Sequence, residues 1–253
     1  YGAEFNYGID KIGDNIILKF YIESINNEYA LNGENVLEMN ISNLLDIVFD
    51  PILEKGVFKK EYLDVEKETL KKVIESKIDD KDTFAYEECI SAMYGENGFG
   101  IYKYGYIEDI NDINVENLTN YYNWLIQNAK IDIYISGKIN KENITRFLLK
   151  NENIIKLKGR EGKYIINNYY TERKQIVDKP KEIIKSMNVT QGKLVIGMDV
   201  NYNIENFYET ALVYNSILGD GANSLLFQNV REKAGLAYSA KSTFVKQKMN
   251  VFI

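Results

Sequence analysis

The chain opens with apolar and polar residues in alternation. In the stretch IILKFYIE, residues 16–23, every second side chain is apolar, which is typical of a half-buried strand. The stretch AEFNYGI, residues 3–9, comes before it, and Gly13 and Asp14 stand between the two. Because glycine and aspartate favour tight turns, we expect a β-hairpin over residues 3–24.

Helical spacing replaces this alternation after the hairpin. Apolar residues recur three and four positions apart in several segments, as they do on one face of a helix. Asn114 stands just before one such segment, where its side chain can accept hydrogen bonds from the first free amides of a helix. We therefore predict helices over residues 34–53, 59–78, 82–94 and 114–129, then an alternating strand at 131–136 and a helix capped by Asn140.

Residues 158–180 interrupt these patterns with charged residues, paired tyrosines and a proline, and no period holds throughout. A buried strand at 192–200 and a helix at 204–218 are predicted after the interruption. We therefore expect a first domain at 1–157, a linker at 158–180 and the start of a second domain at 181–253. Strands that precede helices in both parts indicate an α+β architecture in which helices cover one face of each sheet.

A short amphipathic segment near the end of the chain predicts a helix that is followed by a strand after a sharp turn. We call this turn, residues 231–240, the corner. Ser224 is a suitable N-cap, and Gly235 stands where a helix commonly ends in the left-handed conformation. Arg231 lies in the last turn and Tyr238 in the following strand. One interpretation is purely structural: the charge of Arg231 interacts favourably with the helix dipole, and Tyr238 packs on a sheet. Alternatively, the guanidinium and the phenol converge on one ligand.

Composition limits the class of protein further. The 253 residues carry a net charge of −6 and a pI near 5.0, which argues against a nucleic-acid or anionic-membrane surface. The chain has no apolar run of the roughly eighteen residues that a membrane span needs, and no signal-peptide pattern at its start. We therefore expect a cytoplasmic protein without a membrane span. The single cysteine, Cys89, excludes an internal disulfide and is predicted to be a small buried apolar group.

A longer motif covers the corner and indicates a family. The segment LGDGANSLLFQNVREKAGLAYSAKS, residues 218–242, closely resembles the second-half signature of the inverzincin zinc peptidases, the family of pitrilysin, insulysin and the mitochondrial processing peptidase. Earlier segments, among them YGENGFGIYKYG and INVENLTNYY, have counterparts in the same order, so the resemblance covers nearly the whole chain. It implies an α+β fold of two consecutive processing-peptidase-like α/β sandwich halves of a clamshell. The first half then lacks an N-terminal part, and the second is incomplete.

The resemblance also implies a set of substrate-binding residues. In this family an arginine and a tyrosine seven residues later bind substrate, and the tyrosine can donate to the carbonyl oxygen as it becomes negative. The matching residues are Arg231 and Tyr238. An edge strand of the family receives the extended peptide, and Ala3, Glu4 and Phe5 occupy its place. A peptide or small protein is therefore the expected substrate.

The zinc centre is where the sequence departs from the family. Inverzincins bind zinc through the two histidines of an H-x-x-E-H helix and a downstream glutamate. This chain contains no histidine. Glu66, Ile74 and Asp79 match the surroundings of the downstream ligand, but Val73 holds the ligand position. A shift that makes Glu75 the ligand would misplace both later matches. We therefore predict no catalytic residue, no metal ligand and no cofactor in this chain.

Three functions remain open from the sequence. The first is a non-catalytic subunit that supplies peptide-binding surface and the Arg231/Tyr238 corner to a homologous zinc-bearing subunit, in a heterodimer, or that pairs with itself. The second is a fragment of an active zinc endopeptidase whose histidine motif lies upstream of Tyr1. The third is a structural assembly subunit. The missing zinc ligands favour the first, with zinc expected only in the partner.

Overall fold

A computed structural model describes residues 2–13, 15–95, 98–158, 160, 179–200, 207–246 and 250–253. The chain forms two compact units, each assembled from segments far apart in the sequence. The first unit contains Tyr1–Asp10, Ile17–Ile74 and Tyr106–Asn168, and the second contains Lys11–Ile16, Glu75–Gly105 and Tyr169–Ile253. The predicted linker at 158–180 lies mostly outside the described residues, so the predicted domain boundaries stay a prediction.

The predicted hairpin is confirmed. Strand β1 (Glu4–Ile12) pairs with β2 (Asn15–Glu23) in a two-stranded sheet. Gly13 has a φ of 65°, a left-handed value that glycine adopts without steric cost. This conformation allows the chain to reverse between the two strands.

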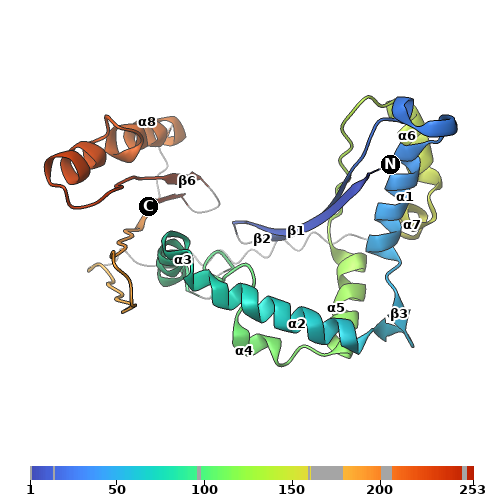
Figure 1. Ribbon diagram of the computed structural model, residues 1–253, viewed down its shortest axis with the longest axis horizontal. Helices are drawn as coiled ribbons and strands as arrows, with labels where there is room; N and C mark the ends of the chain where they lie inside the picture. Colours follow the sequence, from blue (N-terminus) through green and yellow to red (C-terminus); the bar gives the residue numbers. More distant parts are fainter. Residues whose placement is uncertain are drawn as a thin grey trace. The chain divides into compact units, whose positions relative to one another are not determined.

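Helices form the main core of the first unit. Helix α1 (Val36–Phe49) lies beside α6 (Lys141–Lys150), as Figure 1 shows. The buried Ile41 and Leu45 of α1 pack against Ile144 of α6. Helix α7 (Glu152–Lys156) joins the same cluster, and Asn153 Nδ2 donates to Asp46 Oδ1 of α1 at 2.8 Å. Short 3-10 turns, η1 (Asn27–Tyr29) and η2 (Leu31–Gly33), precede α1. The predicted helix caps at Asn114 and Asn140 are both present.

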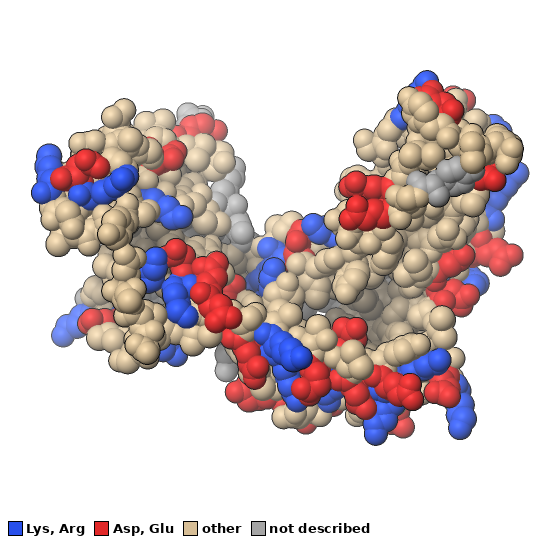
Figure 2. All heavy atoms as spheres, in the orientation of Figure 1, with Lys and Arg blue, Asp and Glu red and all other residues tan. Residues whose placement is uncertain are grey.

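The first unit contains a second group of helices, of which the two longer ones follow the predicted ranges closely and the short one has no predicted counterpart. This group comprises α2 (Lys60–Glu75), α4 (Ile107–Ile110) and α5 (Val115–Asn128), with a small hairpin of β3 (Leu53–Glu54) and β4 (Val57–Phe58). Thr119 of α5 accepts from the Phe58 amide at 3.1 Å, which joins the hairpin to the helix. Acidic and basic side chains are interspersed along α2, as Figure 2 shows, which is typical of a solvated helix face.

The predicted strand at 131–136 is wrong, since these residues pair with no neighbouring strand in the described structure. Ile135 instead packs on the α1–α6 core, and Tyr134 on its other side is 89% exposed. Ile133, on the same side of the segment as Ile135, is 44% exposed, so the apolar side of the alternation is covered only in part. A strand also needs a partner backbone, which the alternation of side chains cannot supply.

The second unit places helices against a small antiparallel sheet. Its strand order is β5 (Met198–Asp199), β7 (Asn250–Phe252) and β6 (Phe244–Lys246). Helix α8 (Phe207–Gly219) lies over this sheet (Figure 1). Ala211 of this helix packs on Phe244 and Phe252. A separate cluster forms where Ile90 and Tyr94 of α3 (Lys81–Tyr94) meet Phe99. A 3-10 turn, η3 (Ser76–Ile78), precedes α3.

The predicted buried strand at 192–200 is mostly wrong. Only β5 pairs within this range, and Leu194 and Ile196 are 85% and 62% exposed. The predicted helix at 204–218 is confirmed from Phe207 onward, and its first residues lie outside the described structure. No helix among the described residues is both long and apolar enough to cross a membrane.

Candidate functional site

The predicted helix at the corner starts where the sequence indicates. Ser224 is almost completely buried, and its Oγ accepts from the Phe227 amide at 3.4 Å while donating to the Gly221 carbonyl at 2.8 Å. The side chain therefore satisfies one of the free amides at the start of the helix, as an N-cap does. The cap fixes where the helix begins and hence which residues its last turn contains.

The helix then widens into a π-helix over Phe227–Lys233, which the sequence did not predict. Its backbone bonds run from residue i to i+5, and the Ala234 amide accordingly donates to the Asn229 carbonyl at 3.1 Å. Gly235 has a φ of 62° and donates to the Arg231 carbonyl at 3.1 Å. Gly235 therefore ends the helix in the predicted left-handed conformation. Short π-helical turns are frequent at functional sites.

Arg231 lies in the last turn with its side chain at the surface. Its guanidinium carbon stands 4.5 Å from the centre of the Phe227 ring, and its Nε is 3.6 Å from Glu232 Oε1. The side chain remains 44% exposed. Arg231 is therefore partly held by neighbours on its own helix while its remaining donors face solvent.

The prediction that Tyr238 lies in a strand is wrong. The strand begins at Phe244, and Tyr238 lies in the irregular segment between the helix and the strand. It is 82% exposed, and its hydroxyl has no hydrogen-bond partner among the described residues. Packing on a sheet therefore does not explain this tyrosine. A phenol with its hydroxyl in solvent is free to donate to a ligand.

The segment after Tyr238 is anchored to α8 at one close contact. The Ser242 amide donates to the Gly219 carbonyl at 3.2 Å, and Ser242 Oγ donates to Asn215 Oδ1 at 2.8 Å. A Cβ on Gly219 would lie 2.2 Å from the Ser242 amide nitrogen, so only glycine permits this approach. The corner is therefore fixed at both ends, by the helix cap at Gly235 and by this contact.

The predicted edge residues lie at the start of β1. Glu4 and Phe5 begin the strand, while Ala3 precedes it, and all three are exposed. β1 pairs only with β2 in the described structure, which leaves its other edge without a strand partner there. These residues belong to the first unit and Arg231 and Tyr238 to the second. Their joint contact with one peptide stays a prediction.

The residues present do not fit a zinc ion. Val73 is half-buried on α2, and its isopropyl group has no lone pair to donate to a metal. Glu75, the alternative ligand, is exposed. Among the described residues, no three histidine, cysteine, aspartate or glutamate side chains lie close enough to hold a metal ion. The chain contains no histidine at any position.

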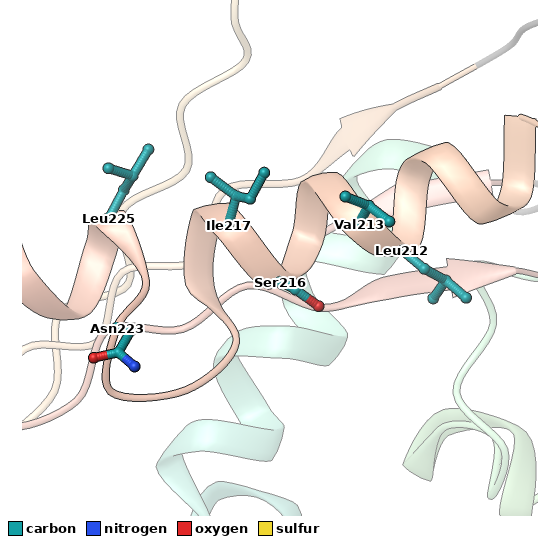
Figure 3. A pocket seen from close by; sticks show the side chains of 6 residues that line it. All are labelled: Leu212, Val213, Ser216, Ile217, Asn223 and Leu225. Carbon is teal, nitrogen blue, oxygen red and sulfur yellow. The ribbon is translucent and has the colours of Figure 1, made fainter.

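An open apolar depression lies on the outer side of α8 and the loop that follows it. Figure 3 shows Val213, Ile217 and Leu225 projecting from the same side of this region, and Asn223 in the loop. Leu212 and Ser216 complete the lining. No titratable side chain lines the depression, so it offers a contact surface for an apolar group and no acid–base chemistry.

A half-buried ion cluster lies elsewhere in the second unit. Lys77 Nζ stands 3.4 Å from Glu87 Oε2 and 3.3 Å from Glu88 Oε1, and it also lies over the Tyr102 ring at 4.7 Å. Burial raises the pKa of Glu87, and the nearby positive charge of Lys77 opposes the rise without cancelling it. Burial likewise raises the pKa of Cys89, which favours a neutral thiol over a nucleophilic thiolate.

Solved structures with the same arrangement define the fold class. A conserved protein from Enterococcus faecalis V583 matches all of this chain with a TM-score of 0.75 and 25% identity, over 58% of its own length. The peptidase M16 inactive domain from Pseudomonas fluorescens matches 99% of this chain and 56% of that chain, with a TM-score of 0.58 and 16% identity. The chain therefore has the mixed helix and strand fold of these proteins.

The family follows from sequence matches. Residues 112–252 match the family described as "Peptidase M16 inactive domain". A Bacillus subtilis protein named "Probable inactive metalloprotease YmfF" is 33% identical over 96% of this chain and 55% of its own length. The chain belongs to the M16 metallopeptidase family, and the resemblance expected from its sequence is confirmed. It spans about half the length of the curated relatives it matches.

Two features of the site were missed by sequence reasoning. The π-helix leaves no signal in the hydrophobic pattern, because Leu226, Val230 and Ala234 would line one face of an α-helix equally well. The Phe227–Arg231 contact did have a signal, since an aromatic and a cationic residue stood four positions apart in a predicted helix.

Proposed function

We propose that this chain is a zinc-less, non-catalytic member of the M16 family that supplies peptide-binding surface to a homologous zinc-bearing subunit. The proposal rests on the corner, where the Arg231 guanidinium and the Tyr238 phenol are exposed, in a chain that has no histidine and has Val73 at the expected ligand position. Arg231 and Tyr238 flank a helix end fixed by Gly235, yet both keep donors in solvent. A side chain that served only packing or capping would not need this exposure.

The chemistry of the two groups suits an extended peptide. A guanidinium donates to carbonyl or carboxylate oxygens, and a phenol donates a single hydrogen bond to one oxygen. The open edge of β1 can add main-chain hydrogen bonds to a peptide without requiring a particular sequence. Binding of this kind needs no metal in the chain itself, and the proposed partner supplies the zinc and the hydrolytic water.

The relatives support a non-catalytic role in part. The Bacillus protein carries "inactive" in its name, and the Pseudomonas structure is an inactive domain of an M16 peptidase. The half-buried Val73 at the expected ligand position weakens the alternative of a fragment from an active peptidase, because even an upstream histidine motif would lack its third protein ligand. The experiment below distinguishes the proposed peptide-binding subunit from a purely structural subunit.

The test uses peptide cleavage by this chain together with a zinc-bearing M16 subunit. If the Tyr238 phenol donates to the developing oxyanion, Tyr238→Phe should slow cleavage by about 100- to 1000-fold, the usual effect of removing such a donor. Tyr134→Phe is the matched control, because Tyr134 is similarly exposed but belongs to the first unit. Assembly of the pair is measured separately by sedimentation. Normal assembly with unchanged cleavage by Tyr238→Phe would show that the chain is a structural subunit.

A further inference from the structure

The guanidinium of Arg231 lies over the ring of Phe227, four residues earlier on the π-helix. The guanidinium carbon lies 4.5 Å from the ring centre, well inside the roughly 6 Å over which a ring attracts a cation. Phe227 is half-buried, so its ring is held by the surrounding residues, whereas Arg231 is exposed. The ring therefore acts as a fixed platform beneath a side chain that otherwise has many rotamers.

The backbone beneath this pair is also fixed. The Arg231 carbonyl accepts from the amides of Ala234 and Gly235, so the orphan carbonyl at the end of the helix is satisfied. Only the torsions of the Arg231 side chain remain to be set. The guanidinium carbon lies over the Phe227 ring, and Glu232 Oε1 is 3.6 Å from the Arg231 Nε. The two terminal Nη groups are left as the edge that can receive a ligand.

We infer that Phe227 is a positioning residue that holds Arg231 with its two Nη groups ready to receive a carbonyl or carboxylate oxygen of a peptide. The inference rests on the proposed role of Arg231 in peptide binding. An arginine that is already ordered loses less side-chain entropy when the ligand arrives, so stacking raises affinity without contacting the peptide. A planar guanidinium held at one edge can also form two parallel hydrogen bonds to a carboxylate.

Three substitutions separate the ring from the bulk of the side chain. Phe227→Leu keeps an apolar group of similar size but removes the π face, and Phe227→Tyr keeps the face. Phe207→Leu is the control for loss of a ring, because Phe207 packs edge-on against Phe244 at 6.0 Å in the core under α8. Thermal unfolding of each variant shows whether a change in binding reflects a loss of folded protein.

The first measurement observes the pair without any peptide. In NMR spectra of the whole chain, the Arg231 side-chain protons should be shifted upfield by the ring beneath them, and an Arg231→Met variant identifies their signals. Phe227→Leu should remove the shift and lower the order parameter of the Arg231 Nε–H group, while Phe227→Tyr should preserve both. Unchanged Arg231 signals in Phe227→Leu would overturn the inference, whatever the peptide data show.

The second measurement is the affinity for a fluorescently labelled mixture of unstructured casein peptides. Phe227→Leu should weaken binding about 2- to 5-fold, as expected for the loss of an exposed cation–π contact, and Phe227→Tyr should bind like the unmodified protein. In the Arg231→Met background, Phe227→Leu should have no further effect, which a merely structural role would not produce. An equal effect of Phe227→Leu in both backgrounds contradicts the inference.

The two proposals fail in different ways. If Arg231→Met binds the peptides normally, the proposed role of Arg231 is wrong, and the NMR measurement still decides whether Phe227 holds its side chain. If Arg231→Met weakens binding while Phe227→Leu does not, the proposed function stands and the positioning role is wrong.

Discussion

Neighbouring residues restrict the side chains of Arg231 and Tyr238 to different degrees. Arg231 is held by a ring and a carboxylate on its own helix, whereas Tyr238 extends into solvent from an irregular segment. Neighbouring residues also determine how favourable a charge is at a given position. Glu87 is a carboxylate whose burial outweighs the attraction of a neighbouring lysine, so its charge is held at a cost in folding free energy.

Because of this cost, we predict that Glu87→Gln changes the melting temperature by an amount that depends on pH. Burial raises the folded-state pKa of Glu87 above its ordinary value of 4.5, so the folded protein binds the proton more tightly than the unfolded chain. The free energy of unfolding therefore falls as the pH rises from 4.5 through the folded pKa. Glu87→Gln removes this ionisation and should raise the melting temperature at neutral pH, with a smaller gain in acid.

The measurement is thermal unfolding at a series of pH values from about 4 to about 7.5. Glu75→Gln, at the exposed end of α2, is the control for removing a carboxylate that is in water. A lower melting temperature for Glu87→Gln at neutral pH would show that the ion pair with Lys77, 3.4 Å away, outweighs the cost of burial.

At the scale of elements, the corner depends on where the neighbouring elements meet. Gly219 ends α8 and touches the Ser242 backbone, and this contact holds the segment that carries Tyr238. Alanine ordinarily stabilises a helix by about 0.5 to 1 kcal/mol relative to glycine. A contact of 2.2 Å to a backbone nitrogen reverses that preference here, since the backbone cannot rotate away as a flexible side chain can.

Gly219→Ala should therefore destabilise the second unit by about 1–3 kcal/mol, the usual cost of forcing extra volume into a packed site. Chemical denaturation measures the loss, and peptide affinity should fall at the same time if the corner binds peptides. Gly192→Ala is the matched control, because a Cβ at Gly192 would meet no atom within 4 Å. Equal stability of the two variants would mean that the Gly219–Ser242 contact is looser than the structure shows.

The second prediction at this level concerns the edge of β1 that does not pair with β2. If an extended peptide adds to this edge, amide hydrogens in residues 2–8 should exchange more slowly when peptide is bound. Hydrogen exchange followed by mass spectrometry measures the protection, and α1 serves as the internal reference because it lies in the same unit without offering a strand edge. Unchanged exchange across residues 2–8 at saturating peptide would remove the edge from the proposed binding surface.

At the scale of the whole molecule, the composition of the chain decides its metal chemistry. A catalytic zinc site takes three protein ligands, and imidazole is the usual donor. A chain without histidine and with Val73 at the expected carboxylate position should bind no stoichiometric zinc. The expectation is tested by metal analysis of purified protein that has been treated with chelator and then reloaded with zinc. One tightly held zinc per chain would contradict it.

Features that depend on local chemistry can be predicted from the sequence of this chain. The hairpin, α1, α2, α3 and α5 follow from periodicity, and the caps at Asn114 and Gly235 follow from side-chain size and hydrogen bonding. The most specific part of the family resemblance is the motif within residues 218–242. Such features survive in a single sequence because each depends on residues a few positions apart.

Features that depend on residues far apart in the sequence are visible only in the folded chain. Whether an alternating segment becomes a strand depends on a partner backbone, which is why 131–136 and most of 192–200 were predicted wrongly. The approach of Gly219 to Ser242 also needs two segments that no periodicity relates. The exposure of Tyr238 is of the same kind, because a side chain's access to solvent is set by everything that folds around it.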